Sequence, residues 1–86
     1  MTKSKIKELI FKERARQDAK WGKQRHQLNS QWMTILTEEI GEVAECVCKT
    51  EVPPVKTRAR KIWLKNMKKE LVQSAAVIFA WLESQE

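Results

Sequence analysis

The sequence predicts an all-α fold in a single domain of residues 1–86. Three observations point to it. The chain has only two Gly and two Pro, too few for a turn-rich β fold. It combines 42% hydrophobic with 33% charged residues, which argues against disorder. Apolar residues also recur every three or four positions, as on the buried face of a helix.

The first predicted helix runs from about residue 5 to residue 20. Ile6, Leu9 and Ile10 give this otherwise charged segment a short apolar face. Trp21-Gly22 interrupts the pattern, and the mostly polar residues up to Leu28 show no sustained periodicity. We therefore expect a loop between this helix and the next.

The second helix is predicted from residue 29 or 30 to about Lys49. Asn29 or Ser30 can cap its start, because a side-chain oxygen there can accept from the free N–H groups of the first turn. Pro53 and Pro54 end the helix, since proline lacks the backbone donor and disfavours helical conformation in the residue before it.

A third helix is predicted over about residues 56–83. The sequence leaves open whether it is continuous or breaks near Asn66. Its apolar residues follow helical spacing through Ile62, Trp63, Met67, Leu71, Ala75, Ile78 and Leu82. The short proline turn predicts that the second and third helices pack as an antiparallel hairpin.

Both of these helices carry acidic residues at positions expected to be apolar. The two stripes read Trp32, Leu36, Glu39, Val43, Cys46 and Trp63, Met67, Glu70, Ser74, Val77, Trp81. A buried carboxylate is costly unless a metal or a cationic partner neutralises it. Residues three or four apart share a helix face, which pairs Glu39 with Glu42 and Glu70 with Gln73.

The position of the turn predicts that the two acidic pairs meet. Glu39 lies fourteen residues before Pro53, and Glu70 lies sixteen residues after Pro54. In an antiparallel hairpin Glu39 and Glu70 would lie at a similar level along the two helix axes, so we expect one shared metal site.

The net charge of +6 is distributed unevenly. Nine of the seventeen basic residues fall between Lys3 and Arg25 and seven between Lys56 and Lys69, on either side of an acidic stretch at residues 38–51. This layout suits a polyanion bound through a metal, and it also suits DNA.

We expect a cytoplasmic protein without a membrane anchor. The longest apolar run, residues 75–82, is far shorter than the roughly 20 residues that span a bilayer. Residues 1–7 are polar and basic, without the apolar core of a signal peptide. Cys46 and Cys48 lie two apart on one helix and cannot bridge to each other, which favours a reducing compartment.

Two motifs carry a family resemblance. They are Glu38-Glu39-Ile40-Gly41-Glu42 and Glu70-Leu71-Val72-Gln73. They resemble the Glu-Glu-x-x-Glu and Glu-x-x-Asp signature of the MazG-like, all-α nucleoside triphosphate pyrophosphohydrolases, with Gln73 in place of Asp. The segments at residues 16–26 and 75–83 are similar to short MazG-like proteins of phages and prophages, and the resemblance covers about residues 13–83.

The resemblance implies a MazG-like bundle of three to four helices that hydrolyses a nucleoside triphosphate, often a deoxynucleotide, to the monophosphate and pyrophosphate. Glu39, Glu42, Glu70 and Gln73 would hold Mg²⁺, or Mn²⁺, with oxygen ligands. Glu38 points about 100° away from Glu39, so it would position or deprotonate the attacking water. The alternative for Glu38 is a solvated surface charge.

Four further residues are candidates for substrate contacts. Trp21, His26 and Trp32 lie where the family's base-binding residues cluster, and an indole can stack on a nucleobase. Lys69, one turn before Gln73, is the best candidate for a phosphate contact. The simpler alternatives are core packing for Trp32, a polar loop position for His26 and a solvated helix face for Lys69.

Two other functions remain open. One is a catalytically weak or inactive nucleotide-binding homologue, because Gln73 removes one ligand charge. The other is a small basic DNA-binding or regulatory protein of phage origin. Against direct nucleic-acid binding, no helix-turn-helix pattern is visible, and the acidic residues of the second helix would face a polyanion.

We also expect a homodimer or homotetramer. A hairpin with one extra helix cannot cover both faces of its acidic groove, and 86 residues lie near the lower limit for a self-sufficient core. The helical bundle should therefore be completed by oligomerisation.

Overall fold

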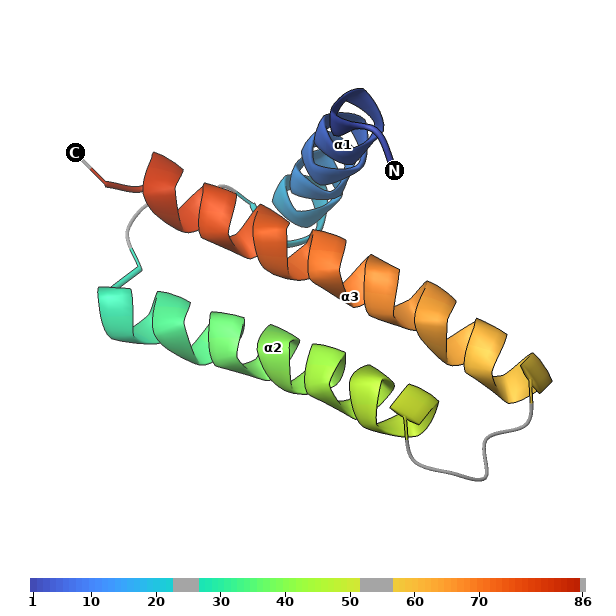
Figure 1. Ribbon diagram of the computed structural model, residues 1–86. Helices are drawn as coiled ribbons and strands as arrows, with labels where there is room; N and C mark the ends of the chain where they lie inside the picture. The colour runs from blue at the N-terminus through green and yellow to red at the C-terminus, as the bar shows by residue number, and fades with distance from the viewer. Residues whose placement is uncertain (23–26, 52–56, 86) are drawn as a thin grey trace.

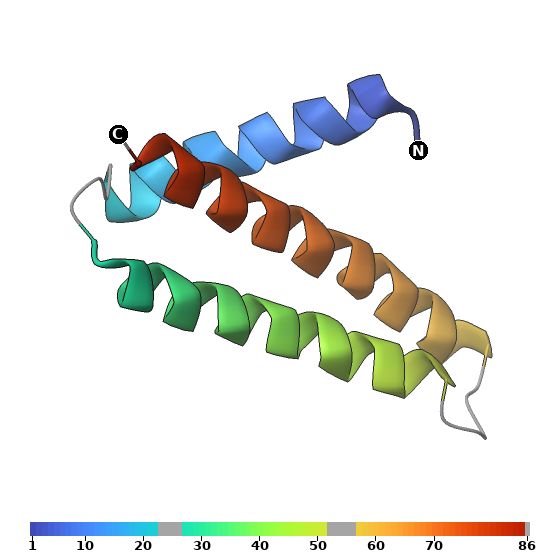
Figure 2. The ribbon, with the colours of Figure 1, turned by 60° about the vertical axis from the view of Figure 1, so that its left-hand side comes forward.

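The computed structural model describes residues 1–22, 27–51 and 57–85, and in these ranges it contains three helices and no strand. They are α1 (Lys3–Trp21), α2 (Asn29–Glu51) and α3 (Thr57–Glu83). In both ribbon views α3 lies between α1 and α2 (Figures 1 and 2). The all-α prediction is confirmed. None of the three helices is long and apolar enough to cross a bilayer.

The ends of α1 have clear local causes. Thr2 caps the helix, because its side-chain oxygen accepts a 3.1 Å hydrogen bond from the Lys5 N–H. Gly22 ends it with φ 75° and ψ 174°, a conformation essentially restricted to glycine. The Gly22 N–H donates to the Asp18 carbonyl at 2.8 Å, so the last turn closes there.

The start of α2 differs from the expected cap. The Gln31 side chain accepts a 2.7 Å hydrogen bond from the Leu28 N–H, the reciprocal half of a capping box. Asn29 uses its side-chain oxygen elsewhere, accepting from the Trp81 indole N–H at 2.9 Å. This bond ties the end of α3 to the start of α2, which lie at the same end of the helix pair in Figure 2.

The antiparallel α2–α3 hairpin holds the core. Trp32, Val77 and Ala80 are buried together, and Ile35, Leu36 and Trp81 pack against them. The third helix is continuous through Asn66, so the break that the sequence left open does not occur. The buried hydrophobic residues of the described chain are few, namely Trp32, Cys46, Ala76, Val77 and Ala80.

α1 packs on α3 rather than on α2. Phe11 and Phe79 meet edge to face with ring centroids 5.3 Å apart. Arg14 forms ion pairs with Glu83 at 3.0 Å and with Asp18 at 3.2 Å. None of these contacts involves α2, and a space therefore remains between α1 and the start of α2.

Candidate metal centre

Three carboxylates converge from the two helices of the hairpin. Glu39 and Glu42 project from one face of α2 and Glu70 projects from α3, and each offers an oxygen within 4.8 Å of the other two. Glu39 and Glu70 are half-buried, whereas Glu42 is exposed. Glu39 and Glu70 therefore lie at the same level along the two helices, as the position of the prolines predicted.

Two oxygens of this carboxylate cluster have no donor from outside the cluster among the described residues. Glu39 Oε2 and Glu70 Oε2 are buried and make no hydrogen bond in the described part of the chain. A buried acceptor without a donor costs free energy. Mg²⁺ and Mn²⁺ take oxygen ligands, so three converging carboxylates with two unsatisfied oxygens fit a hard divalent cation.

The burial and the mutual proximity of these carboxylates raise the pKa values of two of them. Burial, followed by a shared hydrogen bond with Glu42 and the charges of Glu42 and Glu39, raises the pKa of Glu70 to about 7. Burial, followed by the charge of Glu42, also raises the pKa of Glu39. Three carboxylates this close cannot all ionise cheaply without a cation among them.

Arg16 on α1 is paired with an acidic residue of its own helix. Arg16 donates to Glu13 through Nε at 3.0 Å and through Nη2 at 2.8 Å. The Glu13 hydrogen bond is the main cause that raises the pKa of Arg16, and the charges of Glu13 and Glu39 contribute as well. Arg16 and Glu13 could not be singled out as neighbours of the site from the sequence, because no pattern in it determines how α1 is oriented on the hairpin.

A pocket of about 410 Å³ adjoins the carboxylate cluster. Glu39 belongs to both, so a ligand in the pocket would reach the cluster directly. The volume is that of a small-molecule site. The walls come from all three helices: Arg14, Gln17, Asp18, Trp21, Gly22, Trp32, Ile35, Glu38, Glu39, Val77, Ala80 and Glu83.

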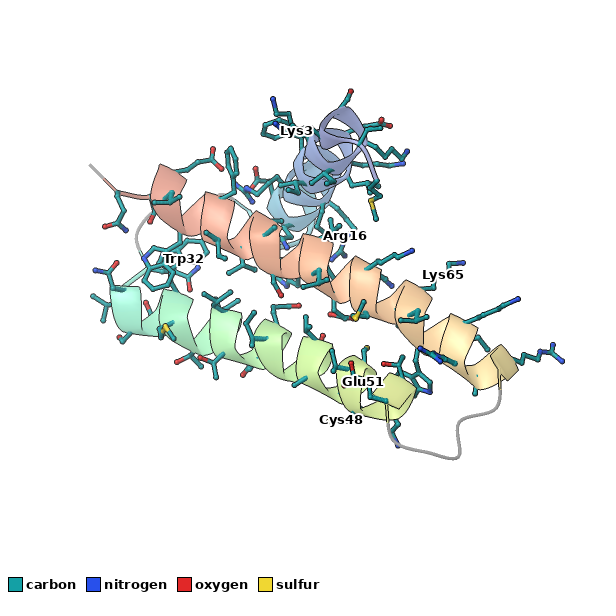
Figure 3. All side chains as sticks on the ribbon, viewed as in Figure 1. Lys3, Arg16, Trp32, Cys48, Glu51 and Lys65 are labelled. Atoms are coloured by element: carbon teal, nitrogen blue, oxygen red, sulfur yellow. The ribbon has the colours of Figure 1, made fainter. Side chains whose placement is uncertain are left out.

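Two tryptophans line this pocket in different ways. Trp21 is 51% exposed, and its ring has Lys20 Nζ at 4.8 Å and the Arg16 guanidinium at 5.8 Å. Trp32 is only 5% exposed, and its indole N–H has no partner among the described residues. In Figure 3 Trp32 lies between the start of α2 and the last turns of α3, where Val77 and Ala80 are buried with it. Trp32 thus serves the core and the pocket wall together.

The other predicted site residues are scattered around the cluster. Glu38 is exposed and lines the pocket. Gln73 lies half-buried one turn after Glu70, and Lys69 is exposed beside Glu70. His26 lies outside the described residues.

In comparisons with known proteins, the chain matches no family model, no curated protein and no solved structure.

Proposed function

We propose that this protein is a MazG-like, divalent-cation-dependent nucleoside triphosphate pyrophosphohydrolase. The observation that carries the proposal is the carboxylate cluster, where Glu39, Glu42 and Glu70 converge with two buried, unpaired oxygens beside a pocket lined by two indoles. A metal-binding group next to an aromatic pocket suits a ligand with a phosphate chain at one end and a flat base at the other.

The roles of the acidic residues follow from their positions. Glu39, Glu42 and Glu70 would hold Mg²⁺ or Mn²⁺, and the Gln73 amide oxygen can add a neutral ligand. When bound, the cation offsets phosphate charge and polarises the phosphorus under attack. Glu38 lines the pocket and does not belong to the three-carboxylate cluster, so we assign it the role of orienting or deprotonating water.

The substrate would lie along the pocket. Trp21 is exposed enough to stack on a base, while Trp32 forms part of the wall. Three carboxylates and a triphosphate are all anionic, so cations beyond the metal are needed at the phosphate end. Arg16, whose charge reaches Glu39, and Lys69, beside Glu70, are the candidates.

Gln73 favours a second candidate, a nucleotide-binding homologue with weak or no catalysis. Three carboxylates hold a divalent cation less tightly than four, because each removed charge lowers the attraction. Both candidates share the same ligand, and turnover separates them. We further propose that the protein acts in the cytoplasm as a homo-oligomer.

The test is pyrophosphate release from a panel of canonical and modified deoxynucleoside triphosphates with Mg²⁺ or Mn²⁺. Glu39→Gln should abolish release. Glu45→Gln should not, because Glu45 is exposed on the same helix and lies outside the cluster. DNA binding is measured in parallel across a salt series.

The outcomes separate the candidates. Release that depends on Glu39 supports the enzyme. Nucleotide binding without release supports the inactive homologue. Steeply salt-dependent DNA binding with no nucleotide binding would refute both and favour the DNA-binding alternative.

A further inference from the structure

The first half of α3 carries a row of basic side chains without acidic neighbours in the sequence. Residues 58–69 include six Lys or Arg and no Asp or Glu. Four of these basic residues recur every three or four positions, which places them on one side of the helix. We call this set the basic stripe: Arg58, Lys61, Lys65 and Lys68.

The four side chains of the basic stripe are exposed and unpaired. Every ion pair among the described residues begins from Lys5, Arg14 or Arg16 on α1, so none of them involves the stripe. Like charges one helical turn apart repel each other, which makes α3 less stable by itself. A polyanion bound along the stripe would offset this repulsion.

The basic stripe lies on the side of α3 away from α2. Trp63 faces α2, where Lys49 Nζ lies 5.9 Å from its ring centroid. Lys65 follows Trp63 by two residues and is therefore turned about 200° from it. Glu70 is turned about 140° from Lys65, so the carboxylate cluster lies on another side of the helix. In Figure 3 Lys65 is drawn above α3, away from α2.

This placement bears on the sequence-based expectation that direct nucleic-acid binding is disfavoured. That expectation assumed that the acidic residues of α2 would face a polyanion. In both ribbon views α3 lies between α1 and α2, so α3 separates the acidic residues of α2 from the basic stripe (Figures 1 and 2). A polyanion on the stripe would therefore not face them.

Two lysines on α1 form a second basic row. Phe11 and Arg14 contact α3, and Lys7 precedes them by four and seven residues, which places it on the same side of α1. Lys3 lies one turn before Lys7, and both lysines are exposed and have no ion pair with a described residue. The side of α1 that contacts α3 thus continues as a basic surface toward the start of the helix.

The two basic rows lie on sides of α1 and α3 that are turned toward each other. Lys68 precedes Phe79, which contacts α1, by eleven residues, and it is turned only about 20° from it. In Figure 2 α1 and α3 are closest near the C-terminus of the chain and move apart toward its N-terminus. The rows are therefore carried by two separate, diverging helices.

This arrangement suits the two phosphate backbones of duplex DNA. The basic stripe is about 15 Å long, and each DNA strand carries one phosphate per about 3.4 Å of the duplex axis. B-DNA has a backbone on either side of a major groove about 12 Å wide, whereas that groove is narrow in duplex RNA. A single strand is bound largely by stacking on aromatic side chains, and the one aromatic residue within the stripe, Trp63, faces α2.

We propose that the basic stripe, together with Lys3 and Lys7, binds the phosphate backbones of duplex DNA without reading its sequence. Lys and Arg contacts to phosphates position a protein on DNA but carry no direct sequence information. This DNA-binding surface is additional to the nucleotide site and does not depend on the proposed enzymatic function.

The experiment measures the affinity for a duplex of about 20 base pairs by fluorescence anisotropy, between 50 and 200 mM salt. The wild type is compared with a stripe variant, Lys61→Gln with Lys65→Gln. The matched control is Lys12→Gln with Arg60→Gln, which removes the same charge from two exposed, unpaired cations. Lys12 is turned about 140° from Lys7, and Arg60 is turned about 140° from Lys65.

We expect the logarithm of the wild-type binding constant to fall with the logarithm of the salt concentration with a slope of about −4 to −5, as for four to six phosphate contacts. The affinity then falls roughly 100-fold or more between 50 and 200 mM salt. The stripe variant should lower the magnitude of the slope by about 2, and the control should keep the wild-type slope.

Several results would overturn the proposal. Equal changes of slope in the stripe variant and the control would indicate general charge attraction. Absence of binding at the lowest salt concentration would exclude a DNA surface. Equal affinity for single-stranded DNA or for duplex RNA would contradict the assignment to duplex DNA, as would binding to anionic lipid vesicles in place of DNA.

Two further measurements keep the test independent of folding and of the enzyme. Circular dichroism checks that both variants fold, and the wild-type salt slope and strand preference need no variant. The stripe variant should release pyrophosphate as the wild type does, because Lys61 and Lys65 lie outside the carboxylate cluster and the pocket. A wild type that binds DNA and nucleotides but releases no pyrophosphate would refute catalysis and support the DNA surface.

Discussion

Replacing Glu70 with Gln should stabilise the metal-free protein at pH 8 while removing its response to metal. Glu70 is half-buried beside Glu39 and Glu42, and its pKa is raised from 4.5 to about 7. At pH 8 the folded protein holds Glu70 ionised against two neighbouring carboxylates. Gln keeps the size and the hydrogen-bonding oxygen but removes the charge.

The sign and size follow from proton linkage. A carboxyl whose folded pKa is raised binds more protons in the folded state between its two pKa values, so stability falls as pH rises from about 4.5 to about 7 and then levels off. At ~1.4 kcal/mol per pH unit the loss is at most roughly 3 kcal/mol. Water reaches part of the site, so we expect about 1–2 kcal/mol, or roughly 5–15 °C in Tm for a chain of this size.

The assay is urea unfolding with EDTA at pH 5 and pH 8, at one fixed protein concentration. Glu70→Gln should gain stability over the wild type at pH 8 and little at pH 5. With Mg²⁺ or Mn²⁺ at pH 8, the wild type should be stabilised and the variant should not. Glu45→Gln is the control, since Glu45 is exposed and outside the cluster, and it should follow the wild type throughout.

A wild type with equal stability at pH 5 and pH 8 in EDTA would refute the electrostatic reasoning. So would a Glu70→Gln variant destabilised equally at both pH values. Metal stabilisation that persists in Glu70→Gln would remove Glu70 from the ligand set.

Three further outcomes are expected. Gln73→Asp should tighten Mn²⁺ binding about tenfold in calorimetry, because it adds a fourth carboxylate charge, and an unchanged affinity would place Gln73 outside the site. Arg16→Ala should weaken the binding of a nonhydrolysable nucleotide about tenfold, whereas Lys12→Ala, an exposed cation on the same helix, should change it little; equal effects would indicate general charge attraction. Trp32→Ala should cost about 3–5 kcal/mol in urea unfolding, because the indole is 95% removed from solvent in a small core, and a loss below 1 kcal/mol would contradict that packing.

The hairpin and its acidic pairs could be predicted because local rules fix them. Pro53 and Pro54 separate two long periodic segments, and an antiparallel return from that turn leaves little freedom in register. Glu39 and Glu70 occupy core-facing positions, so their meeting follows from the register. Whether they bind a metal is chemistry that the fold alone does not decide.

The placement of α1 could not be predicted. Its apolar face is short, and its inner contacts are largely polar, such as Arg14 with Glu83. Periodicity reports only apolar contacts, so it gives no docking angle for such a helix. The pocket between the three helices depends on that angle, and it was missed.

Periodicity also could not separate the core of the hairpin from its exposed apolar residues. The apolar series from Ile62 to Leu82 combines residues that face α2, such as Trp63, with residues that face solvent, such as Leu71 and Ile78. On a helix these positions differ by a rotation of about 100°, and both are apolar. A wide apolar stripe therefore predicts that a helix face is buried, but it does not show which of its residues the rest of the chain covers.

The carboxylate cluster also affects the stability of the helix pair that carries it. The carboxylate cluster places Glu39 and Glu70 where burial and mutual repulsion raise their pKa values, so in the absence of a cation it weakens the α2–α3 contact. A divalent cation bound among the three carboxylates is therefore expected to strengthen the contact between the two helices.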